Sequence, residues 1–79
     1  MSKIPYTNST GHLSVEVHLK SAADVFLVDS NNFKNYTSGK PFKYYGGHYR
    51  QTPVHISVTG SGRWYLIVRG TNQYKYRFY

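Results

Sequence analysis

Residues 12–19 read HLSVEVHL, and apolar and polar side chains alternate along the whole segment. The apolar members share one side of an extended chain, and they are Leu13, Val15, Val17 and Leu19. Because neighbouring side chains of a β-strand point to opposite faces, a period of two is typical of a strand with one buried face. The segment therefore predicts a half-buried β-strand.

The same character recurs along the rest of the chain. Residues 23–29 are rich in β-branched and aromatic side chains, which are enriched in strands. Residues 54–59, 63–69 and 74–79 again alternate between apolar or aromatic and polar side chains. In the segment 63–69 we expect Trp64 on the apolar face, as an anchor of the core.

Glycine-rich breaks separate these segments. Gly60-Ser61-Gly62 predicts a hairpin, and Gly46-Gly47 predicts a turn between short strands over residues 42–45 and 48–51. Residues 32–39 predict a single helical turn that ends at its glycine. We expect an all-β fold, a small jelly-roll-like β-sandwich of about seven short antiparallel strands.

The length of 79 residues fits one domain, which we place at residues 11–79 after a flexible N-terminal segment over residues 1–10. There is no cysteine, so the core depends on apolar side chains alone, and a reducing compartment is favoured. The opening residues lack the pattern of a signal peptide, and the longest apolar run, residues 25–28, is far too short to span a bilayer. We therefore expect a cytoplasmic protein without membrane insertion.

Positive charge dominates the composition. Ten Lys and Arg residues stand against three Asp and Glu residues, which gives a net charge of +7. Such an excess favours an acidic partner, whether nucleic acid, an anionic membrane surface or an acidic protein. The alternative is a surface whose charge only keeps the domain soluble.

Catalytic chemistry finds little support in the sequence. Asp24 and Asp29 lie at opposite ends of one predicted strand, too far apart for paired acid–base work. Gly60-Ser61-Gly62 lacks the spacing of a nucleophile elbow. His48 and His55 could meet across the turn at Pro53, but two histidines without a carboxylate make a weak metal site. We expect no enzymatic activity, no cofactor and no metal.

Aromatic and cationic residues mix around the predicted turn at residues 46–47. We place the contact surface for a partner there, on Lys43, Tyr45, His48, Tyr49 and Arg50. Flat rings and hydrogen-bond donors beside a glycine turn permit close approach to an anionic or aromatic group. A charged hairpin that only confers solubility is the competing interpretation.

The tail over residues 74–79 also interleaves tyrosine with Lys75 and Arg77. Aromatic faces and cations together are the means by which proteins bind single-stranded nucleic acids. The alternation nevertheless favours a core face for Tyr74, Tyr76 and Phe78. We expect a binding or docking module for a partner protein or anionic ligand, with self-association through an edge strand as a further option. The alternative function is single-stranded nucleic-acid binding on an OB-like barrel.

Core and turn motifs follow one another from residue 23 to residue 64, and they are Ala23-Asp24-Val25-Phe26-Leu27-Val28-Asp29, Asn32-Phe33, Tyr36, Gly39, Tyr45-Gly46-Gly47, Pro53-Val54 and Gly62-Arg63-Trp64. With these motifs the chain resembles a small bacterial family of domains of unknown function that occur alone or attached to TIR domains. Arg69 departs from the acidic residue that the resemblance leads us to expect. The resemblance implies a β-sandwich that acts as a sensing or docking module in bacterial conflict systems, and it supplies no catalytic residue.

Overall fold

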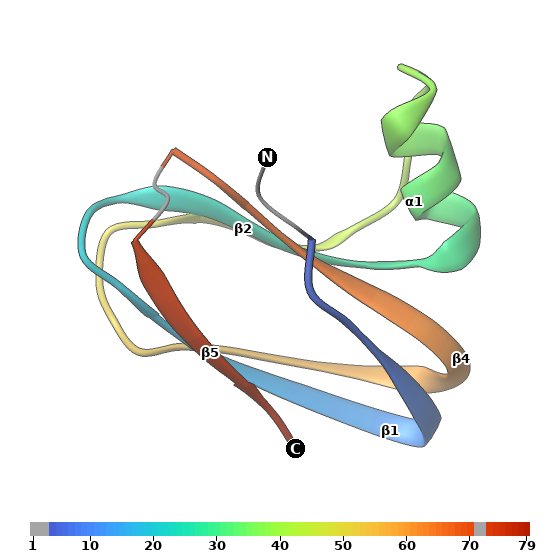
Figure 1. Cartoon of the computed structure of the whole chain (residues 1–79), viewed down its shortest axis with the longest axis horizontal. Helices are drawn as coiled ribbons and strands as arrows, with labels where there is room; N and C mark the ends of the chain where they lie inside the picture. Colours follow the sequence, from blue (N-terminus) through green and yellow to red (C-terminus); the bar gives the residue numbers. More distant parts are fainter. Residues whose placement is uncertain (1–3, 71–72) are drawn as a thin grey trace.

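The structure, a computed structural model, describes residues 4–70 and 73–79. Their strands form one antiparallel sheet with the order β3-β2-β4-β1-β5, as Figure 1 shows. The elements in chain order are β1 (Tyr6–Leu19), β2 (Ala23–Asp29), α1 (Ser30–Thr37), β3 (Tyr45–Tyr49), β4 (Val54–Arg69) and β5 (Tyr74–Phe78). The expected all-β class is confirmed.

The predicted hairpin at Gly60-Ser61-Gly62 is wrong, because β4 runs through it as one strand of 16 residues. Gly60 pairs with Gly11 of β1, and both glycines have positive φ angles, of 143° and 146°. Backbone conformations of this kind are open to glycine and strained for other residues. The facing glycines therefore let β1 and β4 bend together, so the sheet curves instead of ending in a turn.

The curvature replaces the predicted sandwich of about seven strands with a single sheet, in which the described residues form five strands. Segment 54–69 is one strand where two were expected, and residues 42–44 are not a strand. The predicted domain boundary at residue 11 does not coincide with a structural one, because β1 already begins at Tyr6 and pairs with β4 from there.

The concave face of the sheet encloses the main core. Even-numbered residues of β4 on both sides of the bend face it, together with odd-numbered residues of β1 and β2. Its buried members are Leu13, Val15, Val17, Val25, Leu27, Val54, Ile56, Val58, Trp64 and Leu66. The predicted apolar faces are thus buried, and Trp64 is only 5% exposed.

On the convex face, a second and smaller core forms around Phe26, Val28 and Ile67. The helix α1 covers it with aromatic side chains, and Phe33 stacks on Tyr65 with ring centroids 3.9 Å apart. Both faces of β2 are therefore buried, which explains its continuous apolar sequence. Toward β1 and β5 the convex face carries polar side chains.

The helix begins at Ser30, two residues before the predicted helical turn. The Asp29 carboxylate accepts a hydrogen bond from the Asn32 backbone N–H at 2.8 Å, which satisfies one of the unpaired donors of the first turn. The helix gives way at Ser38, and Gly39 follows with a φ of 74°. Where a single helical turn over residues 32–39 was expected, a longer helix of eight residues spans Ser30–Thr37.

Candidate binding surface

The sequence-predicted contact residues lie on and beside β3, which among the described strands pairs with β2 alone and forms one edge of the sheet. Gly46-Gly47 is not a turn, contrary to the prediction, but the middle of this strand. A Cβ atom at Gly46 would collide with the Val25 carbonyl oxygen of β2. The glycine is therefore needed for strand pairing at this position.

The alternation of β3 distributes these residues over two faces of the sheet. Tyr45 and Tyr49 lie on the concave side, where Tyr49 packs against the main core and Tyr45 makes an edge contact with Trp64. His48 lies on the convex side, where its Nδ1 atom is 2.9 Å from the Asp24 carboxylate. Tyr45 stays 54% exposed.

The five residues also separate along the strand. Lys43 comes before β3 on the side of α1, and its backbone N–H donates to the Asn32 side-chain oxygen at 2.7 Å. Arg50 follows the other end of β3, and four steps of about 3.3 Å already separate Tyr45 from Tyr49 by about 13 Å. His48, Tyr49 and Arg50 thus share one end of β3, with His48 and Tyr49 on opposite faces of the sheet, and Lys43 and Tyr45 lie apart from them.

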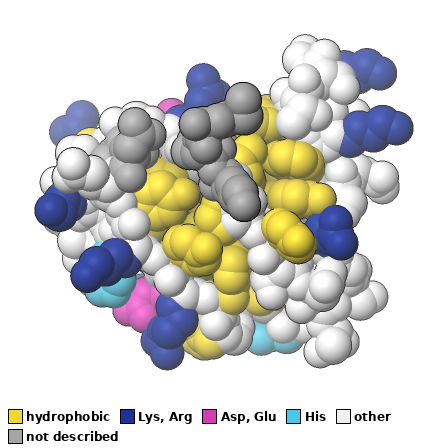
Figure 2. Space-filling model, viewed as in Figure 1, with side chains coloured by type: hydrophobic (Ala, Val, Ile, Leu, Met, Phe, Trp, Pro, Cys, Tyr) yellow, Lys and Arg dark blue, Asp and Glu magenta, His cyan; other side chains and the backbone are white. Residues whose placement is uncertain are grey.

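Positive charge gathers at the end of the sheet opposite α1. The turn from β1 to β2, the loop from β3 to β4, the end of β4 and the start of β5 all lie there, as Figure 1 shows. Four exposed cations belong to these segments, and we call Lys20, Arg50, Arg69 and Lys75 the basic rim. Figure 2 shows several dark blue side chains along this end of the molecule, and others near α1 and elsewhere on the same face.

The strand register explains the gathering of the basic rim. Tyr49 pairs with Ala23, Asp24 pairs with Arg69, and His18 pairs with Lys75, so cations distant in the sequence share one end. Sequence reasoning included Arg50 in the site and missed the other three. Each of the four cations lies at or next to a strand end. Which strand ends are neighbours in space depends on the strand order, which the sequence pattern does not give.

The carboxylates in the described residues are already engaged elsewhere. Asp29 caps α1, and Asp24 contacts His48. Glu16 contacts Arg77 at 2.8 Å and His18 at 3.2 Å, and the hydrogen bond from Arg77 lowers the pKa of this carboxyl group. Within the described residues, 4–70 and 73–79, no carboxylate forms an ion pair with a cation of the basic rim.

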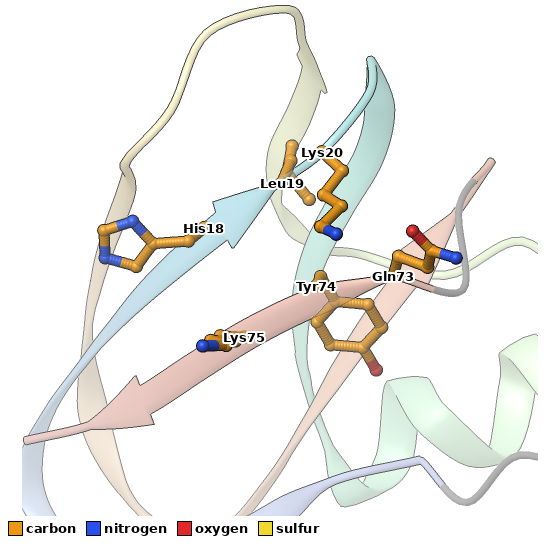
Figure 3. Close-up of a pocket in the computed structure, with 6 residues that line it drawn as sticks. All are labelled: His18, Leu19, Lys20, Gln73, Tyr74 and Lys75. Atoms are coloured by element: carbon orange, nitrogen blue, oxygen red, sulfur yellow. The ribbon is translucent and has the colours of Figure 1, made fainter.

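A cavity of about 310 Å³ opens where the end of β1 meets the start of β5. Its lining includes two cations of the basic rim, and the residues are His18, Leu19, Lys20, Gln73, Tyr74 and Lys75. In Figure 3, Lys20, Gln73 and Tyr74 gather on one side of the strand pair, whereas His18 and Lys75 project to the other. Burial is the main cause that raises the pKa of Tyr74.

The aromatic row of β5 serves the core only in part. Tyr74 and Phe78 are half-buried and pack against the main core, as the alternation predicted. Tyr76 between them is 46% exposed, although it faces the same side. Its ring lies 6.1 Å from that of Tyr74 and 5.5 Å from that of Phe78. One ring of the row is therefore accessible to a partner.

The histidines have separate partners. His48 contacts Asp24, whereas the His55 ring lies 3.3 Å from the Tyr79 hydroxyl. Within the described part of the chain, no three His, Asp or Glu side chains gather closely enough to hold a metal ion. No helix in residues 4–70 or 73–79 has the length and apolar character that crossing a membrane requires.

Fold and surface together define a small all-β domain, a curved five-stranded sheet with one helix and a basic rim. The chain belongs to the DUF1883 family, a domain of unknown function, whose family model matches residues 8–76. No curated protein and no solved structure matches the chain. Membership agrees with the expected kind of domain and assigns it no activity.

Proposed function

We propose that this domain is a non-catalytic binding or docking module that recognises an anionic ligand or the acidic surface of a partner protein through its basic rim. One observation carries the proposal: Lys20, Arg50, Arg69 and Lys75 share one end of the sheet, and no carboxylate of the described residues forms an ion pair with them. Asp24 lies opposite Arg69 in the β2–β4 ladder, but its carboxylate contacts His48. Such a concentration of uncompensated charge attracts anions and raises their rate of encounter.

The absence of catalysis in this proposal is supported by the roles of the carboxylates. Capping by Asp29 and ion pairing by Asp24 and Glu16 leave no pair of acids with a shared reacting position. In line with the family resemblance drawn from the sequence motifs, we place the module in a bacterial sensing or conflict system, alone or attached to a TIR domain. Its cytoplasmic location is part of the same proposal.

Single-stranded nucleic acid is the second candidate partner. Tyr76 and Tyr79 are exposed, and the Arg77 guanidinium lies 4.9 Å from the centre of the Tyr79 ring. Rings beside cations support base stacking with phosphate neutralisation. The OB-like architecture is not part of this candidate, because β4 separates β1 from β2, which are paired neighbours in an OB barrel.

The test compares two double variants of equal net charge. Arg50→Gln with Arg69→Gln removes two cations from the basic rim, and Lys34→Gln with Lys40→Gln removes two cations near α1. Fluorescence anisotropy would measure the binding of labelled polyglutamate and labelled oligothymidine at two salt concentrations. We expect the rim variant to lose about tenfold in affinity for the bound probe, and the control to stay close to the parent protein.

The outcomes separate the candidates. If oligothymidine is the bound probe, the plot of the logarithm of the binding constant against the logarithm of the salt concentration should be less steep for the rim variant. Two lost phosphate contacts should reduce its slope by about 1.4. Binding of polyglutamate alone would favour an acidic protein partner. Equal losses in both double variants, or no binding of either probe at low salt, would refute recognition through the basic rim.

A further inference from the structure

The cavity lies at the end of the β1–β5 ladder, where the last residue pair leaves the core incompletely covered. Leu19 pairs with Tyr74 at the end of the β1–β5 ladder, and both are only half-buried against the main core. Since β5 is the outermost strand of the sheet, no further strand formed by the described residues covers this position. The volume of about 310 Å³ lies at the small end of the range for ligand cavities.

An aromatic surface borders the cavity. The half-buried Tyr74 ring forms part of its wall, and the exposed Tyr76 ring lies 6.1 Å away, centre to centre. Aromatic faces bind planar rings by offset stacking, and they do so with little selectivity for the ring system. Burial raises the pKa of Tyr74, so this part of the cavity wall stays uncharged well above neutral pH.

The two lysines at the cavity carry positive charge. Lys20 extends on the same side of the strand pair as Tyr74 in Figure 3, whereas Lys75 and His18 project to the opposite side. Glu16, two residues before His18, is held by its contacts with Arg77 and His18. No acidic residue is among those that line the cavity, so an anionic group beside Tyr74 meets the Lys20 ammonium group without a competing carboxylate.

From this combination of ring and charge, we propose that the cavity binds an aromatic phosphate, a small molecule whose planar ring stacks on Tyr74 while its phosphate contacts Lys20. A mononucleotide is the simplest biological member of this class. The inference rests on the proposed function in one respect, because Lys20 and Lys75 belong to the basic rim. The cavity proposal goes beyond the proposed function because it names a small ligand and a ring contact that a polyanion does not require.

Nuclear magnetic resonance titration of the labelled domain tests this directly. The probes are adenosine monophosphate and phenyl phosphate, with adenosine and inorganic phosphate as fragments that carry only one of the two features. Both aromatic phosphates should shift the amide signals of residues 18–20 and 73–75, and bind about tenfold more tightly than either fragment. Phenyl phosphate that binds as well as the nucleotide would show that any aromatic phosphate suffices.

Four variants locate the site. Tyr74→Phe keeps the ring and should keep the affinity, whereas Tyr74→Leu and Lys20→Gln should each reduce it about tenfold. The rim variant Arg50→Gln with Arg69→Gln lies outside the cavity and should still bind adenosine monophosphate. If this variant loses only polyanion binding, both proposals stand. If the parent protein binds aromatic phosphates but no polyanion, the rim proposal alone is overturned. No shift at millimolar probe, or equal affinity for inorganic phosphate, would overturn the cavity proposal.

Discussion

Replacement of Trp64 by alanine should remove most of the stability of this domain. The indole is 5% exposed, packs in the main core, and donates from Nε1 to the Gly60 carbonyl oxygen at 3.1 Å across the bend of β4. Truncation of a buried tryptophan costs about 3–5 kcal/mol. A domain of 79 residues has a total of about 4–12 kcal/mol at the usual stability per residue. We therefore expect Trp64→Ala to be largely unfolded or to melt far below the parent.

A second variant separates packing from hydrogen bonding. Trp64→Phe keeps much of the apolar contact but removes the N–H group, and the lost hydrogen bond should cost about 1–2 kcal/mol. For a domain of this size, each kcal/mol corresponds to about 4–8 °C in the melting temperature. Unfolding is best followed by far-ultraviolet circular dichroism, because both changes remove the only tryptophan. An unchanged melting temperature for Trp64→Ala would refute the role of the ring in joining the two halves of β4.

Two further predictions concern charge and strand pairing. Arg77 lowers the pKa of Glu16 below its ordinary value of 4.5, so this contact stabilises the fold above that pH and loses its effect as the pH falls through the folded-state pKa. Arg77→Gln should therefore lower the unfolding midpoint in urea at pH 7, with a difference from the parent that disappears in strong acid; a constant difference would contradict this. Gly46→Ala should detach β3, because its methyl group would occupy the position of the Val25 carbonyl oxygen. The backbone amides of β3 should then exchange their hydrogens faster than in the parent, and those of the β1–β4 ladder at an unchanged rate. Amides of β3 that stay as protected as in the parent would disprove the collision.

Much of the fold follows from the period-two pattern. The alternation in residues 12–19 and 54–59 correctly assigns the buried faces, because a strand in a curved sheet still points every second side chain inward. The strand count could not be predicted in the same way. Gly60 and Gly62 have the composition of a hairpin, but here glycine relieves a bend that only the pairing with Gly11 reveals.

The candidate surface was less predictable than the fold. A local pattern identifies aromatic and cationic residues, and it grouped Lys43 with Arg50 through an assumed turn at Gly46-Gly47. As a continuous strand, the same residues extend along β3 and divide between its faces. Lys20 and Lys75 join Arg50 only through the order of five strands, which depends on pairing between distant segments.

The position of β4 also bears on how the chain acquires this structure. Leu13 pairs with Val58, and Asp29 pairs with Trp64, so both β1 and β2 depend on a strand synthesised dozens of residues later. Contacts between segments so distant in sequence form slowly, because loop closure comes before any gain from pairing. A nascent chain that emerges from the ribosome therefore holds β1 and β2 with unpaired edges until β4 has emerged. During this interval the apolar run of β2 is a natural target for chaperones, and for association with other unfinished chains.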